Sequence, residues 1–143
     1  MPKLKIGDSP RRAEDIRFIT GGGCYVDDMR PPGLLQMAIV RSPHAHADIR
    51  GIETAAALAA PGVAAVLTGQ DMAAAGIGPL QPYEQANIYS GEPFRFPAQY
   101  PLATGQVRYG GQPVAMVIAA SREQALDAAE HVRRIFRLHA TCV

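Results

Sequence analysis

Two histidines spaced two residues apart, His44 and His46, are the side chains best suited by type and spacing to bind a metal ion. In a strand, residues i and i+2 point to the same face, so both rings can reach one ion. Zinc needs three or four ligands, and no standard ligand spacing supplies the rest. We therefore interpret the pair as shaping a turn and hydrogen-bonding locally, with a metal site as the alternative. The other candidate ligands are His131, His139, Cys24 and Cys142.

Three other groups have the residue types of a reactive site. The run Gly21-Gly-Gly23 lacks the Gly-Lys-Ser/Thr of a phosphate-binding loop and is followed by Cys-Tyr-Val-Asp-Asp, so we interpret it as a turn. Cys24 has no local activating group, and we expect a buried or half-buried structural thiol. Ser42 precedes a proline and lacks the context of a nucleophile elbow. The pair Asp27-Asp28 is expected to accept hydrogen bonds from turn amides.

Composition excludes several classes of protein. The chain has 143 residues and a formal net charge of +1, with 48% hydrophobic residues. This length suits one domain spanning residues 1–143 with a sizeable core. No basic stripe or long apolar run is present, so we expect neither nucleic acid nor a membrane as partner. Two cysteines form no disulfide framework, which favours a reduced cytoplasmic protein.

The hydrophobic pattern predicts an α+β domain with a mixed sheet and two or three short helices. Residues 34–40 are apolar almost throughout, so we expect a strand buried on both faces or central in the sheet. Ser121 and Gln124 fit a capping box that opens a helix with one apolar stripe. The other expected elements are strands at 24–26, 45–52, 63–67 and 113–120, and short helices at 55–60, capped by Thr54, and at 72–75, capped by Asp71.

Residues 76–104 form a long segment rich in proline, tyrosine and phenylalanine. We expect it to be irregular. A loop of this length in a compact domain is usually functional or docked against another surface.

Four short segments follow one another in a fixed order along the chain, and together they are more specific than any one of them. They are Thr20-Gly-x-Gly-x-Tyr-Val-Asp-Asp28, Arg41-Ser-Pro-His-Ala-His-Ala47, Pro61-Gly-Val63 and Gly111-Gln-Pro-Val-Ala115. Over about residues 10–132 the chain resembles the N-terminal α/β hammerhead domain of the molybdenum hydroxylases, the family of xanthine dehydrogenase, aldehyde oxidase and carbon monoxide dehydrogenase large subunits.

The resemblance implies an oxidoreductase family whose chemistry lies outside this chain. Complete members use a molybdopterin cofactor, with iron–sulfur clusters and FAD on other domains or subunits, and no cofactor is expected here. No catalytic, cofactor-binding or metal residue is assigned, since no segment matches the later motifs. Gly110-Gly-Gln112 is similar to a cofactor-loop motif, but Pro113 follows it, as in the hammerhead's own element.

The resemblance also implies partners, namely the rest of a large subunit or its companion subunits. Alone, the chain is expected to be non-catalytic and to self-associate. The alternative is a free-standing binding module that uses residues 76–104 for recognition, or His44 and His46 for a metal.

Residues 133–143 depart from the family's pattern, which has an acidic strand ending in Leu-Pro-Ala. Ala140-Thr-Cys142 can be encoded by bases that read Leu-Pro-Ala when shifted by one position. We therefore expect a frameshift to have truncated a large-subunit gene here, with the cofactor-binding domains encoded downstream in the shifted frame. Sequencing the locus tests this, and a shifted frame without those domains contradicts it.

Overall fold

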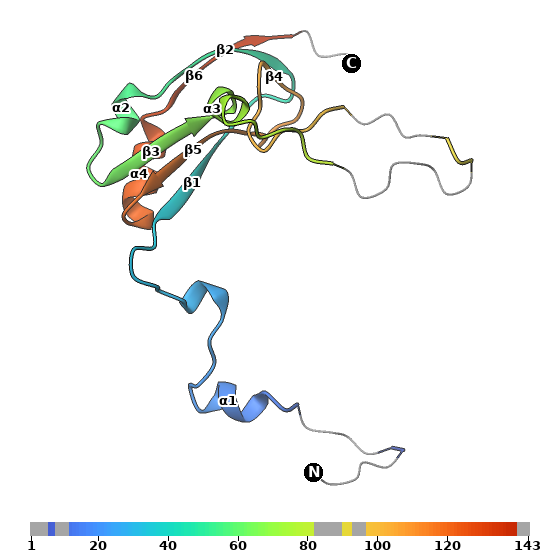
Figure 1. The fold of residues 1–143 in the computed structure, drawn as a ribbon, viewed down its shortest axis with the longest axis vertical. Coiled ribbons are helices and arrows are strands. Elements are labelled where there is room, and N and C mark those ends of the chain that lie inside the picture. Colours follow the sequence, from blue (N-terminus) through green and yellow to red (C-terminus); the bar gives the residue numbers. More distant parts are fainter. Residues whose placement is uncertain (1–5, 8–11, 82–89, 93–96, 140–143) are drawn as a thin grey trace. The chain divides into compact units, whose positions relative to one another are not determined.

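The structure, a computed structural model, describes residues 6–7, 12–81, 90–92 and 97–139 (Figure 1). Contacts divide the chain into two units, Met1–Leu34 and Leu35–Val143, and each is described by itself.

The first unit contains helix α1 (Asp15–Ile19) and a short 3₁₀ helix, Val26–Asp28. The rings of Phe18 and Tyr25 stack with centroids 5.4 Å apart. The expected strand at 24–26 is wrong, because Asp28 Oδ2 accepts a hydrogen bond from Tyr25 N at 2.9 Å and closes the chain into the 3₁₀ turn. The glycine turn is confirmed by Gly21, whose φ of 77° favours glycine.

In the second unit, the described residues form two three-stranded antiparallel sheets, ordered β1-β5-β3 and β4-β2-β6. The strands are β1 (Gln36–Arg41), β2 (Ala47–Glu53), β3 (Val63–Thr68), β4 (Gln106–Val107), β5 (Pro113–Ala119) and β6 (Arg133–Leu138). The helices are α2 (Ala55–Leu58), α3 (Gly69–Ala74) and α4 (Arg122–Glu130).

The α+β class is confirmed, and the segments expected at 34–40 and 113–120 do pair, as β1 and β5. The sheets differ from the expected mixed sheet because every described strand pair is antiparallel. The chain alternates between the two sheets before β5 enters between β1 and β3, and β5 runs opposite to both.

Strand β1 does not have the burial expected of it. It lies at an edge of its sheet, and Met37 is 56% exposed. The central position belongs to β5, in which Val114, Ala115, Val117 and Ala119 are fully buried. Both apolar runs, in β1 and in β5, correctly predicted a strand. Which of the two strands is central depends on strand pairing, since β5 pairs with both β1 and β3.

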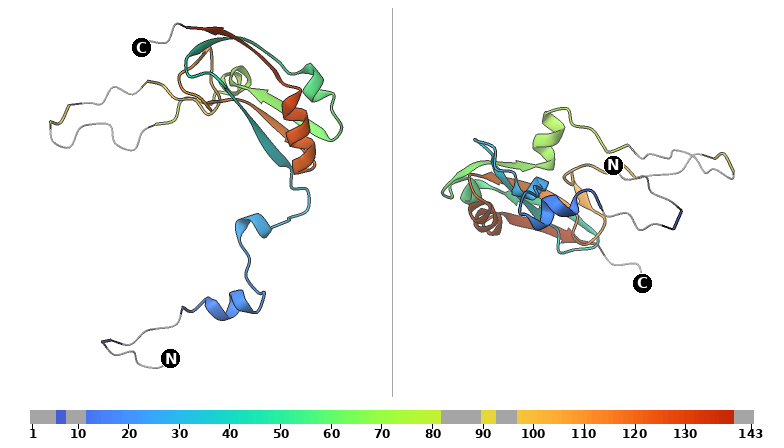
Figure 2. Two further views of the ribbon diagram at one scale, coloured as in Figure 1. Left: turned by 180° about the vertical axis from the view of Figure 1, so that it is seen from behind. Right: turned by 90° about the horizontal axis from the view of Figure 1, so that it is seen from below.

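Helix α4 and the second sheet lie on the same side of the β1-β5-β3 sheet, and the core is packed between these elements (Figure 2). The expected helix begins where the capping signal placed it, since Ser121 Oγ accepts a hydrogen bond from Gln124 N at 3.2 Å. Ala125 and Ala128 of α4 are fully buried, as the apolar stripe predicts, but Leu126, which we expected on the same stripe, is 53% exposed.

The two short helices begin differently from the expected caps. Thr54 precedes α2 but its side chain makes no capping hydrogen bond. Helix α3 begins at Gly69, and Thr68 takes the N-cap position that we assigned to Asp71. Asp71 Oδ2 instead accepts hydrogen bonds from Thr68 Oγ1 at 2.6 Å and Thr68 N at 2.7 Å. These two bonds hold the pKa of Asp71 below its usual range.

The segment 76–104 is described only in part, since residues 82–89 and 93–96 lie outside the described residues. Leu80 and Gln99 form an isolated antiparallel bridge, and Leu102 and Ala103 are buried. In the described ranges, no helix has the length and apolar character needed to cross a membrane.

Gly69 is buried where the start of α3 meets the returning chain. A Cβ atom added at Gly69 would lie 2.4 Å from the carbonyl oxygen of Ala103. Gly69→Ala improves helix propensity, yet it should lower the free energy of unfolding by about 1–3 kcal/mol because backbone atoms must move.

Chemical denaturation measures this effect. Gly78→Ala is the matched control, since its added Cβ meets nothing within 4 Å, and it should change stability by no more than about 0.5 kcal/mol. Equal stability of the two variants would contradict the close approach.

Candidate functional site

The two most recognisable motifs, residues 41–47 and 111–115, meet at the ends of β1 and β5. Ser42 N donates a hydrogen bond to Gln112 O at 2.9 Å, and Gly111 N donates to Ser42 O at 2.8 Å. These bonds extend the ladder past a register shift between Val40 and Arg41. We call the region formed by Ser42, Gly111 and Gln112 the motif junction.

The polar side chains of the motif junction are buried and bonded to backbone. Ser42 and Gln112 are 3% and 5% exposed. Ser42 Oγ accepts a hydrogen bond from His44 N and donates one to His44 O, each at 3.0 Å. Gln112 Oε1 accepts from Arg108 N at 2.7 Å. The junction therefore holds the chain entering β2 and the chain leaving β4 against the ends of the first sheet.

His44 and His46 lie in the loop between β1 and β2 rather than in a strand. The His44 ring packs edge-on against Phe136, with centroids 5.1 Å apart. The His46 ring stacks on His139 at 4.6 Å. The local hydrogen bonds expected here are made by the His44 backbone, and across the described ranges no three His, Cys, Asp or Glu side chains are grouped to hold a metal ion.

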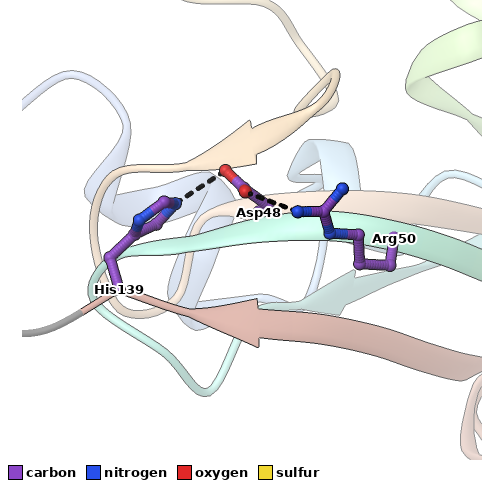
Figure 3. Close-up of polar contacts among 3 residues, drawn as sticks. All are labelled: Asp48, Arg50 and His139. Carbon is purple, nitrogen blue, oxygen red and sulfur yellow. Dashed lines mark hydrogen bonds and ion pairs between the residues drawn. The ribbon is translucent and has the colours of Figure 1, made fainter.

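A charged cluster joins β2 to the end of β6 (Figure 3). His139 Nε2 lies 2.7 Å from Asp48 Oδ1, and Arg50 Nη2 lies 3.3 Å from Asp48 Oδ2. The hydrogen bond from His139 holds the pKa of Asp48 below its usual range. Sequence reasoning missed this cluster because Asp48 and His139 are 91 residues apart. The register of β2 with β6 brings them together.

The remaining candidate residues have structural roles. Cys24 is exposed, which corrects the expected buried thiol, since no described residue of the first unit is buried. Ser42 Oγ bonds to the backbone of His44 and not to its imidazole, so it lacks the base that would activate a serine nucleophile. Asp28 accepts from a turn amide as expected. Cys142 lies outside the described residues.

A cleft of about 350 Å³ lies between residues 49–52, 68–70 and 103–105. Its polar lining is backbone together with Arg50, Thr68, Gln70 and Thr104, which supply neither a carboxylate nor a thiolate. An iron–sulfur cluster requires four protein ligands, normally thiolates, and the chain has two cysteines. The described residues therefore do not fit an iron–sulfur cluster.

The motif junction is tested by Gln112→Leu, which keeps the side-chain volume but removes the acceptor for Arg108 N. Removing this part-buried hydrogen bond should lower the free energy of unfolding by about 1–2 kcal/mol. The control is Gln70→Leu at an exposed position, with an expected change of no more than about 0.5 kcal/mol. Denaturant titration measures both, and equal effects would contradict the role of Gln112.

Comparison with known proteins agrees with this geometry. Residues 20–137 match the α/β hammerhead domain of aldehyde oxidase and xanthine dehydrogenase. This match includes residues 133–137, in the segment that we expected to diverge. Two curated relatives are the carbon monoxide dehydrogenase large chain of Afipia carboxidovorans, 43% identical over 127 residues, and the nicotine 6-hydroxylase large subunit of Paenarthrobacter nicotinovorans, 42% identical over 127 residues. Each alignment covers 89% of this chain, but only 14% and 15% of those relatives.

Solved structures give the same result. Reconstituted CO dehydrogenase from Oligotropha carboxidovorans superposes with a TM-score of 0.82 at 38% identity, over 96% of this chain and 16% of that one. Quinoline 2-oxidoreductase from Pseudomonas putida 86 gives 0.79 at 37% identity, over 94% and 16%. With its fold, its motif junction and these matches, the chain belongs to the α/β hammerhead domain family of the molybdenum hydroxylases.

Proposed function

We propose that this domain is non-catalytic by itself and serves as a packing domain of a molybdenum hydroxylase large subunit. The observation that carries the proposal is the motif junction. Its polar atoms bond to backbone and fix the fold, so the residues most typical of the family stabilise architecture here rather than contact a substrate.

The relatives support an interaction role. Their names describe a large chain, a large subunit and subunit gamma of a dehydrogenase complex. The names also differ in substrate, from carbon monoxide to nicotine, although the hammerhead domain is shared. The proposal assigns oxidation at molybdopterin, together with the iron–sulfur clusters and FAD, to other domains or companion subunits. It also assigns the complete enzyme to the reduced cytoplasm, which the low cysteine content favours.

The alternative of a free-standing binding module has less support. The His44 and His46 rings pack against Phe136 and His139 instead of converging on one point. Much of segment 76–104 lies outside the described residues, so no observation favours a recognition surface there.

The purified chain is expected to carry no stoichiometric molybdenum or pterin and to show no hydroxylase activity, because the cofactor supplies the chemistry and needs groups to bind it. Elemental analysis and pterin fluorescence measure this after expression in a host that makes molybdopterin. A complete carbon monoxide dehydrogenase from the same host is the positive control. About one molybdenum per chain would contradict the proposal.

The chain is also expected to self-associate weakly when its neighbours are absent, because uncovered apolar surface drives association. Ile135 and Leu138 of β6 are exposed apolar residues that contribute to such surface. Sedimentation velocity over a concentration series should show a mass that rises with concentration. A monomer at every concentration would show that this surface does not associate.

A further inference from the structure

The sheet β1-β5-β3 has two apolar faces. Residues directly opposite each other in an antiparallel pair share a face. One such row is Ala38, Val117 and Val66, and it packs into the core with α4 and the second sheet. This face is covered in the way that a two-layer domain requires.

The other face of the same sheet belongs to no core cluster. Its residues form two rows across the three strands, none of them is buried, and all of them are apolar. We call these residues the open face: Met37, Ile118 and Ala65 in one row, and Ile39, Met116 and Leu67 in the next.

The second sheet shows what a solvent-facing surface of this domain looks like. On its outer side, Glu53 is opposite Arg133 and Asp48 is opposite Arg137. Arg133 Nη1 lies 3.3 Å from Glu53 Oε2. Antiparallel sheets that face water alternate apolar and polar residues in this manner. The open face carries no charge on any of its three strands, so it has the composition of a docking surface.

The size of the open face indicates which kind of partner covers it. Two rows across three strands span on the order of 200–300 Å². A stable complex of separate molecules needs about 800 Å² on each partner. A domain of the same chain can use a smaller interface, because the link between domains gives a high effective concentration.

Solved relatives contain this domain as 16% of their chain, so most of each such chain lies outside it. We propose that another domain of the same large-subunit chain packs on the open face. This inference rests on the proposed function and names the surface through which it operates.

The test replaces the matched residues of the Afipia carboxidovorans carbon monoxide dehydrogenase large chain with residues 20–137 of this protein. Met37→Glu places a charge on the open face at an exposed position. Leu126→Glu, on α4, is the control, because Leu126 is 53% exposed compared with 56% for Met37. Both variants are also made in the 143-residue chain, where circular dichroism and thermal melting monitor folding.

We expect Met37→Glu to leave the isolated chain folded but to reduce the yield of assembled, protease-resistant chimera about tenfold or more, because assembly would bury an unpaired charge. Leu126→Glu should behave like the unsubstituted chimera, and Met37→Leu should restore the yield.

Three outcomes would overturn the inference. Equal yields for Met37→Glu and Leu126→Glu in an assembling chimera would overturn the docking surface alone. Failure of the unsubstituted chimera to assemble would overturn the proposed function and the inference with it. A tight dimer of the isolated chain that Met37→Glu abolishes would assign the open face to a second copy.

Discussion

The fold depends on the hydrogen bonds of two buried polar side chains, Ser42 and Gln112, which lie where the chain runs between the first sheet and the second. Each unsatisfied donor or acceptor at such a site would cost about 1–3 kcal/mol, so the surrounding backbone must adopt the geometry that pairs it. Ser42 holds the backbone of His44 before β2, and Gln112 holds the amide of Arg108 after β4. One small polar region therefore sets how two three-stranded sheets are joined.

The second sheet is completed by the last described strand, and a polar side-chain pair lies near each end of that strand. Arg133 pairs with Glu53 where β6 begins, and His139 pairs with Asp48 just beyond its end. Between them, Phe136 reaches the core and contacts the ring of His44. The segment that we expected to diverge is thus an integrated strand, and residues 133–137 belong to the family match.

The two sheets expose different surfaces, and under the proposed function this difference explains how a domain that is non-catalytic by itself takes part in an enzyme. The outer side of the second sheet mixes charged residues with the exposed Ile135, whereas the open face of the first sheet carries no charge. Function is carried by sites and not by folds, so the hammerhead fold alone establishes no activity. The motif junction supplies the rigidity that an adjoining domain requires.

The sequence by itself determined the α+β class, strand β5, the Ser121 cap of α4 and the family, because these depend on local patterns and on the order of motifs. It did not determine that β1 lies at an edge, that Thr68 rather than Asp71 is the N-cap of α3, or that Ser42 N donates a hydrogen bond to Gln112 O. Nor did it reveal that His46 and Asp48 meet His139. Only the tertiary structure decided these points, because each depends on a partner brought close by strand register and chain return, and no local pattern encodes that partner.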